Sequence, residues 1–208
     1  LAIITSYSAN IRILLASPEQ HRESINSKLQ MISTTCQRIA KIVSGLLDFS
    51  RDGQKDPFVP VSITKLLDTT LELCKERFYR NGIFLEVVIT ENEVSVMGRE
   101  TQLSQVLINL LNNSFDAVSN LSEKWVRVDL ELIHGKSVRI KITDSGKGID
   151  QTVAEKIFSP FYTTKPVGQG TGLGLSVARS IVQDHGGRLE IDPQHNQTCF
   201  LIDLPITS

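Results

Sequence analysis

The sequence lacks the features that mark zinc-binding or nucleic-acid-binding chains. Its three cysteines, Cys36, Cys74 and Cys199, lie far apart with no C-x-x-C pair, and with four scattered histidines they form no zinc pattern. We therefore expect free thiols in a reducing compartment. The 22 basic residues nearly balance the 23 acidic ones, so the net charge of −1 offers neither a basic surface for nucleic acid nor an acidic tail.

Long apolar runs are also missing. No run approaches the ~18 residues that a membrane helix needs, so we expect no membrane contact within this fragment and no signal peptide. Because the chain begins at Leu1 rather than methionine, we expect a fragment, and a sensor or membrane segment could precede it. The 40% hydrophobic and 22% charged content is typical of a globular protein.

The first fifty residues have the apolar spacing of paired helices. One set of positions, spaced alternately four and three residues apart, comprises Ile25, Leu29, Ile32, Cys36, Ile39, Val43 and Leu46. A shorter set comprises Leu1, Ile4, Ser8, Ile11 and Leu15, and Ser17-Pro18-Glu19 supplies a turn and a helix start between the two. One hairpin buries such seams poorly, so we expect a homodimer through residues 1–50 that forms a four-helix bundle.

A polar stretch with glycine and proline, residues 51–57, predicts a linker. We therefore expect a helical domain at 1–52 and a second domain at 58–208. In the second domain the patterns predict helices at 62–81, 102–119 and 172–185, and strands at 84–89, 126–132, 137–143, 189–191 and 199–204. The expected fold is α+β: a helical hairpin followed by a two-layer α/β sandwich with much antiparallel sheet.

Three polar residues share one face of the helix predicted at 102–119. Asn109, Asn113 and Asp116 lie at i, i+4 and i+7, away from an apolar stripe that includes Ala117. One interpretation is a row of oxygen donors for a hydrated Mg²⁺ ion. The other is a solvated face of weak helix formers, and the spacing by itself leaves both open.

Two glycine-containing segments follow. Asp144 ends a predicted strand, where it could accept a hydrogen bond from an exocyclic amine, and Gly146 and Gly148 would let the backbone approach a flat ring; a plain turn is the alternative. The second segment, residues 168–175, places alternating glycines before a helix, which suits phosphate binding, although a structural loop is the alternative. It has neither the Walker A nor the Rossmann spacing. Upstream of it, residues 158–165 could form a lid in which Lys165 reaches a phosphate, unless Lys165 is an ordinary surface lysine.

The order and spacing of these segments resemble the histidine kinase family, within the ATPase superfamily that includes gyrase, mismatch-repair and chaperone ATPases. Residues 109–117 resemble the N box, 144–149 the first glycine box, 158–161 the F box and 168–174 the second glycine box. The resemblance covers essentially the whole chain. Ile149 lies in the first glycine box, and Leu173 in the second.

The resemblance implies roles for single residues. Asn113 would bind Mg²⁺, Asn109 would lie beside the phosphates, and Asp116 would line the nucleotide site. Asp144 would bind the adenine amino group, with Gly146, Gly148 and Ile149 beside the base and Thr198 supporting adenine recognition through water. The lid would span residues 163–171. The phosphate end would consist of Thr164, Lys165, Gly170, Thr171, Gly172, Leu173 and Gly174.

The chain departs from the family pattern in two places. The His-Glu-x-x-x-Pro segment that carries the phosphoacceptor would lie just before Leu1, and His21, which has no acidic motif after it, does not replace it. The Gly-x-Gly expected before the last strand is replaced by residues 192–197. The second departure puts the local turn in doubt but not the site.

The implied activity is that of a two-component histidine kinase. Mg-ATP would bind in the α/β domain, a histidine upstream of this fragment would receive the γ-phosphoryl group, and the aspartate of a response regulator receiver domain would take it next. We expect a cytoplasmic core, and the full-length protein could be anchored in a bacterial inner membrane. The alternative from another class is a nucleotide-gated dimeric interaction module without phosphotransfer. A DNA-repair or chaperone ATPase fits less well, because those enzymes carry no such hairpin before the ATP domain.

Overall fold

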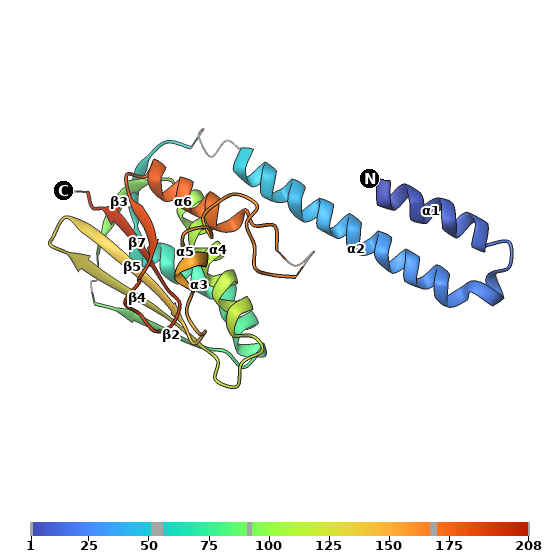
Figure 1. The fold of residues 1–208 in the computed structure, drawn as a ribbon. Helices are drawn as coiled ribbons and strands as arrows, with labels where there is room; N and C mark the ends of the chain where they lie inside the picture. The colour runs from blue at the N-terminus through green and yellow to red at the C-terminus, as the bar shows by residue number, and fades with distance from the viewer. Residues whose placement is uncertain (1, 51–55, 91–92, 167–169, 208) are drawn as a thin grey trace. The chain divides into compact units, whose positions relative to one another are not determined.

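The computed structural model describes residues 2–50, 56–90, 93–166 and 170–207, and it divides the chain into two compact units (Figure 1). One unit holds the chain up to Ser50 together with Thr163–Thr171, and the other holds the remainder. Most of the predicted linker, residues 51–55, lies outside the described residues. The domain division at 1–52 and 58–208 stays a prediction.

The first unit contains a helical hairpin. Helix α1 spans Ala2–Leu14 and packs against α2, which spans Pro18–Ser50. The predicted turn at Ser17-Pro18-Glu19 is confirmed, since proline at the first position of a helix loses no hydrogen bond.

Within the hairpin, the buried side of α1 differs from the predicted spacing at two positions. Its half-buried side chains are Ile4, Tyr7, Ile11 and Leu14, whereas Ser8 and Leu15 are exposed. Tyr7 thus takes the place predicted for Ser8, and Leu14 takes the place predicted for Leu15.

The hairpin leaves large apolar side chains exposed. The exposed fraction lies between 50% and 72% for five of them: Ile3, Ile13, Leu15, Leu29 and Met31. Among the described residues, no helix combines the length and the apolar character that crossing a membrane requires.

The second unit is built on a five-stranded sheet of order β2-β4-β5-β7-β6. Its strands are β2 (Phe84–Ile89), β4 (Trp125–Ile133), β5 (Ser137–Asp144), β6 (Arg188–Ile191) and β7 (Cys199–Pro205). Only β2 and β4 pair in parallel, and the other neighbours are antiparallel. The alternating residues Val126, Val128 and Leu130 face the core, so the predicted adjacent strands with a turn at Gly135 are confirmed.

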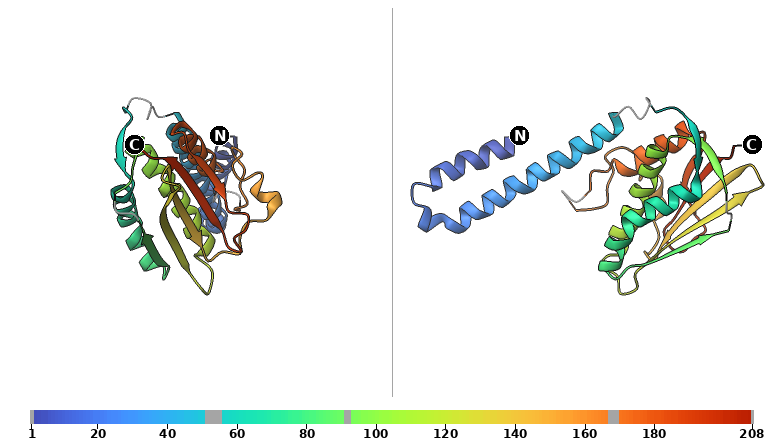
Figure 2. Two further views of the ribbon diagram at one scale, coloured as in Figure 1. Left: turned by 90° about the vertical axis from the view of Figure 1, so that its left-hand side faces the viewer. Right: turned by 180° about the vertical axis from the view of Figure 1, so that it is seen from behind.

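Three helices cover one face of this sheet: α3 (Ile63–Arg80), α4 (Glu100–Val118) and α6 (Gly174–Asp184) (Figure 2). Ser62 caps α3 as predicted, since its hydroxyl accepts a hydrogen bond from the Lys65 N–H at 3.4 Å. The sequence Gly186-Gly187 ends α6, and Gly186 adopts a φ of 70° there. The apolar stripes of the helices meet the sheet in one continuous core, which confirms the two-layer α/β sandwich.

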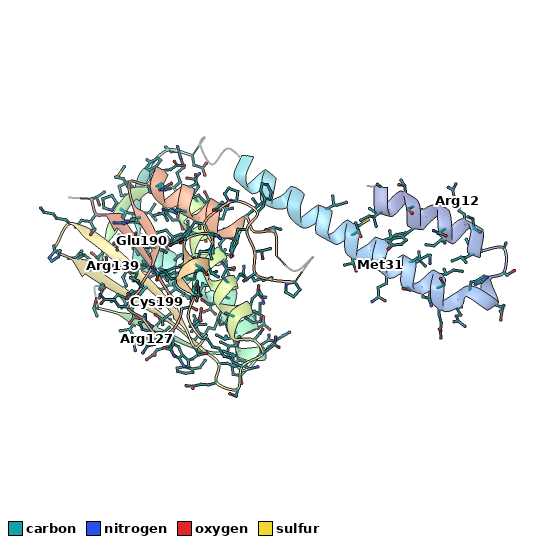
Figure 3. All side chains as sticks on the ribbon, viewed as in Figure 1. Arg12, Met31, Arg127, Arg139, Glu190 and Cys199 are labelled. Atoms are coloured by element: carbon teal, nitrogen blue, oxygen red, sulfur yellow. The ribbon has the colours of Figure 1, made fainter. Side chains whose placement is uncertain are left out.

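The opposite face of the sheet carries charged side chains, among them Arg127, Arg139 and Glu190 (Figure 3). Arg139 pairs with Asp203 at 2.6 Å, and Arg188 pairs with Glu190. This face is therefore a solvated, charge-balanced layer rather than a second core.

Several local predictions differ from the structure. The short elements β1 (Val59–Ser62), β3 (Ser95–Gly98) and α5 (Gln151–Ala154) were not predicted, because four residues are too few for a periodic pattern. Helix α6 begins at Gly174 rather than at Gly172. Ala117, expected on the buried stripe of α4, is exposed.

Arg99 and His185 hold the first described residues of the second unit. The Arg99 Nε–H donates a hydrogen bond to the Asp56 carbonyl oxygen. The Arg99 guanidinium lies 4.5 Å from the centre of the Phe58 ring, and the His185 ring lies 4.9 Å from that centre. Nε2 of His185 accepts the Arg99 backbone N–H at 3.0 Å, so Nδ1 carries the proton and donates to the Ile181 carbonyl at 2.7 Å. The imidazole at the C-terminal end of α6 is therefore neutral and buried.

Candidate functional site

Asp144 is a fully buried carboxyl group at the end of β5. Its Oδ1 accepts the Gly146 N–H at 2.9 Å, and its own backbone N–H donates to the Thr198 carbonyl at 3.0 Å. Burial raises the pKa of Asp144, and the Gly146 N–H together with the nearby Ser114 and Thr198 hydroxyls only partly offsets that rise. The carboxyl group of Asp144 is thus shielded from solvent, and a hydrogen bond fixes the position of one of its oxygens.

The other oxygen of Asp144 has no such partner. Neither Asp144 Oδ2 nor the buried Ser114 Oγ makes a hydrogen bond of good geometry with any described residue. Buried polar atoms in folded proteins nearly always have a hydrogen-bond partner. A buried carboxylate oxygen without a protein donor is therefore expected to bind a water molecule or a ligand. Asp144 Oδ2 would suit an exocyclic amine, which donates hydrogen bonds.

The loop after Asp144 keeps space beside the carboxyl group. A Cβ at Gly146 would lie 2.6 Å from Asp144 Oδ1, so no larger residue fits without displacing that oxygen. Gly148 and Ile149 follow in the same turn and are half-buried. The adenine-side residues predicted from the sequence, Asp144, Gly146 and Thr198, therefore lie together.

Helix α4 contributes the polar face that the sequence predicts. Asn109 Nδ2 donates to the Gly174 carbonyl at 3.2 Å, which joins the N box to the first residue of α6. Asn113, one turn later, is half-buried. The described residues contain no cluster of three or more His, Cys, Asp and Glu side chains that could hold a metal. The amide oxygens of Asn109 and Asn113 are donors of the kind that Mg²⁺ prefers.

Asp116 has a different neighbour. Its carboxylate lies 3.9 Å from the Arg77 guanidinium of α3, and it is exposed. Arg77 also donates to Asn112 Oδ1 at 2.7 Å and lies 3.8 Å from the centre of the Phe115 ring. Asp116 thus takes part in the contact between α3 and α4, and its role in lining a nucleotide site stays a prediction. Sequence reasoning missed Arg77, because nothing in the pattern of α3 points to α4.

The start of α6 is shaped by Gly172. It adopts a φ of 67°, and a Cβ there would lie 2.4 Å from the Phe161 carbonyl carbon. The Phe161 N–H donates to the Gly172 carbonyl at 2.9 Å, and Phe161 itself adopts a φ of 66°. Among the described residues no side chain caps the N-terminus of α6, where backbone N–H groups and the helix dipole favour an anion.

The predicted lid belongs to the other compact unit, so its residues are described by themselves. Thr164 is exposed, whereas Lys165, Gly170 and Thr171 are half-buried, and the Lys165 N–H donates to Thr163 Oγ1 at 3.2 Å. Residues 167–169, which include the predicted first glycine of the second glycine box, lie outside the described residues. The phosphate-binding roles of Thr164, Lys165, Gly170 and Thr171 stay predictions.

Comparison with known proteins gives consistent results. Residues 98–208 match the family described as histidine kinase-, DNA gyrase B-, and HSP90-like ATPase. The two-component sensor PprA of Pseudomonas aeruginosa is 33% identical over 96% of this chain, and the chain spans 22% of that protein.

Solved structures show the same likeness. The catalytic domain of histidine kinase ThkA is 31% identical, with a TM-score of 0.65 over 74% of this chain and 100% of that domain. The structure of ThkA in complex with the response regulator TrrA is 28% identical, with a TM-score of 0.70 over 99% of this chain and 57% of that one.

Proposed function

Since the chain belongs to the histidine kinase-, DNA gyrase B-, and HSP90-like ATPase family, we propose that it binds ATP and transfers the γ-phosphoryl group to a histidine. The observation that carries this proposal is the buried carboxyl group of Asp144, whose Oδ2 is unpaired among the described residues. That acceptor fits the 6-amino group of adenine. Gly146 leaves the space that a flat base needs, and the uncapped start of α6 suits a phosphate.

A magnesium ion fits the residues on α4. Asn113 would hold the ion through its amide oxygen, with Asn109 and Gly174 at the neighbouring phosphates. Bound there, the ion would neutralise charge on the phosphate oxygens. The polypeptide itself contributes position: Asp144 orients the base, and the α4–α6 contact sets the distance between base and phosphates.

The transfer has two steps. The bond between the γ-phosphorus and the bridging oxygen of ATP breaks while a bond forms to a ring nitrogen of the histidine, and ADP leaves. The carboxylate of a response regulator aspartate then takes the phosphoryl group, and the histidine nitrogen is the leaving group. The likeness to ThkA, whose structure was solved in complex with the response regulator TrrA, supports a response regulator as partner. We also propose that Lys165 contacts the γ-phosphate and that this core acts in the cytoplasm of a bacterium.

A phosphotransfer assay tests the proposal. The chain is mixed with ATP labelled in its γ-phosphate and with a separate helical hairpin that carries the His-Glu-x-x-x-Pro segment. We expect labelled hairpin, and we expect none when the acceptor histidine is replaced by glutamine. Binding of ADP without any labelling would favour the nucleotide-gated interaction module, and absence of both would refute an ATP site.

A further inference from the structure

Arg77 on α3 makes three contacts with α4 that neither the apolar core nor the proposed site explains. Its guanidinium donates a hydrogen bond to Asn112 Oδ1 at 2.7 Å, lies 3.8 Å from the centre of the Phe115 ring and lies 3.9 Å from an oxygen of the Asp116 carboxylate. A planar guanidinium can stack on a ring through its face while the N–H groups at its edge contact polar atoms. These contacts therefore fix the position of the Arg77 charge beside α4.

The ion pair within this arrangement adds little to the stability of the fold. The side chains of Arg77 and Asp116 are 51% and 42% exposed, and ion pairs between exposed side chains contribute little to folding. Helices α3 and α4 are already held together in the common apolar core, where the rings of Phe78 and Phe115 meet edge to face with 5.4 Å between their centres. The placement of the Arg77 guanidinium therefore indicates a role other than holding the two helices together.

Asp116 borders two faces of α4. It follows Asn112 by four residues and Asn113 by three, so its carboxylate lies about one helical turn beyond both. Asn113 and Asn109 belong to the polar face that we propose for Mg²⁺ and the phosphates. A carboxylate at the edge of that face repels a phosphate chain, because both carry negative charge. Arg77 contacts Asp116 from the side of α3, so its positive charge offsets this repulsion.

We propose that Arg77 is a positioning residue for the phosphate end of the nucleotide. It holds the Asp116 carboxylate on the α3 side of α4 and offsets its negative charge, which lets the phosphates of Mg-ATP lie against Asn109 and Asn113. Arg77 acts through Asp116 rather than by touching the nucleotide. This inference rests on the proposed function, that the site takes Mg-ATP.

The proposal predicts a loss of affinity that grows with the charge of the ligand. In Arg77→Ala, less positive charge would offset the Asp116 carboxylate beside the phosphates. This substitution should therefore weaken Mg-ATP binding about fivefold and Mg-ADP binding by a smaller factor, since ADP carries one phosphate fewer. Salt screens charges that are exposed to solvent, so the loss should shrink between about 0.05 M and about 0.5 M sodium chloride. Calorimetric titration of the chain measures each affinity.

A double-mutant cycle separates this role from a general loss of packing. If Arg77 acts through Asp116, its effect requires the carboxylate charge. Arg77→Ala should therefore change Mg-ATP affinity by less than about twofold when it is introduced into Asp116→Asn, although it has the larger effect in the unaltered chain.

Arg80→Ala is the matched control on the same helix. Arg80 pairs with Glu76, so its ion pair lies within α3, and its replacement removes the same charge from the chain. Arg80→Ala should leave Mg-ATP affinity unchanged. The urea midpoints of unfolding should be similar for Arg80→Ala and Arg77→Ala, since both substitutions remove an exposed ion pair.

The proposal is overturned if Arg77→Ala binds Mg-ATP as tightly as Arg80→Ala does. It is also overturned if the loss is equal for Mg-ATP and Mg-ADP, insensitive to salt and unchanged in Asp116→Asn, because that result indicates a general change in the packing of α3 against α4. In both cases, ATP binding by the unaltered chain would leave the proposed function standing. If the unaltered chain binds neither ATP nor ADP, the proposed function fails first and this inference falls with it.

Discussion

Asp144 and His185 are both buried titratable side chains, and burial moves their pKa values in opposite directions. Desolvation disfavours the charged form, which raises the pKa of the carboxyl group and lowers the pKa of the imidazole. The carboxyl group has an unpaired oxygen, whereas both nitrogens of the imidazole are hydrogen-bonded. Both hydrogen bonds of His185 are thus made within the fold, whereas Asp144 keeps an acceptor for the ligand contact that we propose.

Replacement of Asp144 by asparagine should separate binding from stability. Because the pKa of Asp144 is raised in the folded state, stability falls as pH rises from the unfolded value of 3.8 toward the folded pKa, and the full penalty is present above it. Asparagine stays neutral and keeps an oxygen for the Gly146 N–H, so the free energy of unfolding at pH 7 should be equal or higher. ADP affinity should fall about 10- to 100-fold, since a hydrogen bond to a charged acceptor is lost. Urea unfolding and calorimetry measure the two quantities, and unchanged ADP affinity would remove Asp144 from the adenine site.

His185 should make stability depend on mildly acidic pH. Its folded pKa lies below the usual 6.5, chiefly because of burial and also because of the nearby Arg99, while the Ile181 carbonyl and Asp184 act in the other direction. The unfolded chain therefore binds more protons below about pH 6.5, and stability should fall as pH drops from there toward the folded pKa. His185→Gln should flatten this slope in urea unfolding between pH 7.5 and 5. The exposed His195→Gln is the control, and an equal effect of both substitutions would contradict the assignment.

At the scale of elements, the position of α6 depends on the backbone turn at Gly172 that precedes the helix. Gly172→Ala would force a methyl group against the Phe161 backbone, so we expect a loss of roughly 3 kcal/mol in the free energy of unfolding and much weaker ATP binding. Gly135→Ala is the matched control, because Gly135 has a similar φ of 64° but open space around it. That substitution should cost only about 1–2 kcal/mol and leave ATP affinity intact. Similar losses in the two variants would mean that backbone conformation alone explains the effect.

The longer elements of the second unit were predictable, and the reason is local. The strand pair β4–β5 alternates over more than four residues, and α4 carries a full apolar stripe, so each pattern repeats often enough to be read. The β1–β3 pair was not predictable, because each strand is short and β1 contains Pro60. The placement of Ser114 near Asp144 was also not predictable, since a single small polar residue within an apolar stripe looks like tolerated packing. This proximity arises only when the folded chain packs α4 beside the end of β5, which no local sequence pattern reveals.

At the scale of the whole molecule, the exposed apolar side chains of the hairpin argue for a homodimer through residues 1–50. Leu29 lies on the predicted seam of α2 and is 50% exposed, whereas Gln30 is an exposed polar neighbour. Leu29→Lys should shift the chain from dimer toward monomer, with at least a roughly tenfold weaker dimer constant. Gln30→Lys adds the same charge off the seam and should not. Light scattering over a concentration series measures the constant, and a monomer at the highest concentration of the unaltered chain would count against the bundle.

The hydrogen bond between Phe161 and Gly172 has a consequence for variation in this fold. It joins Phe161 to Gly172 within the second unit, and the entropy cost of closing the segment between them grows only slowly with its length. Residues between the two anchors can then differ in length and composition at little cost to the sheet or to α6. We therefore expect that exchanging this segment for one of another length would change the kinetics of nucleotide binding while the melting temperature of the second unit stays the same.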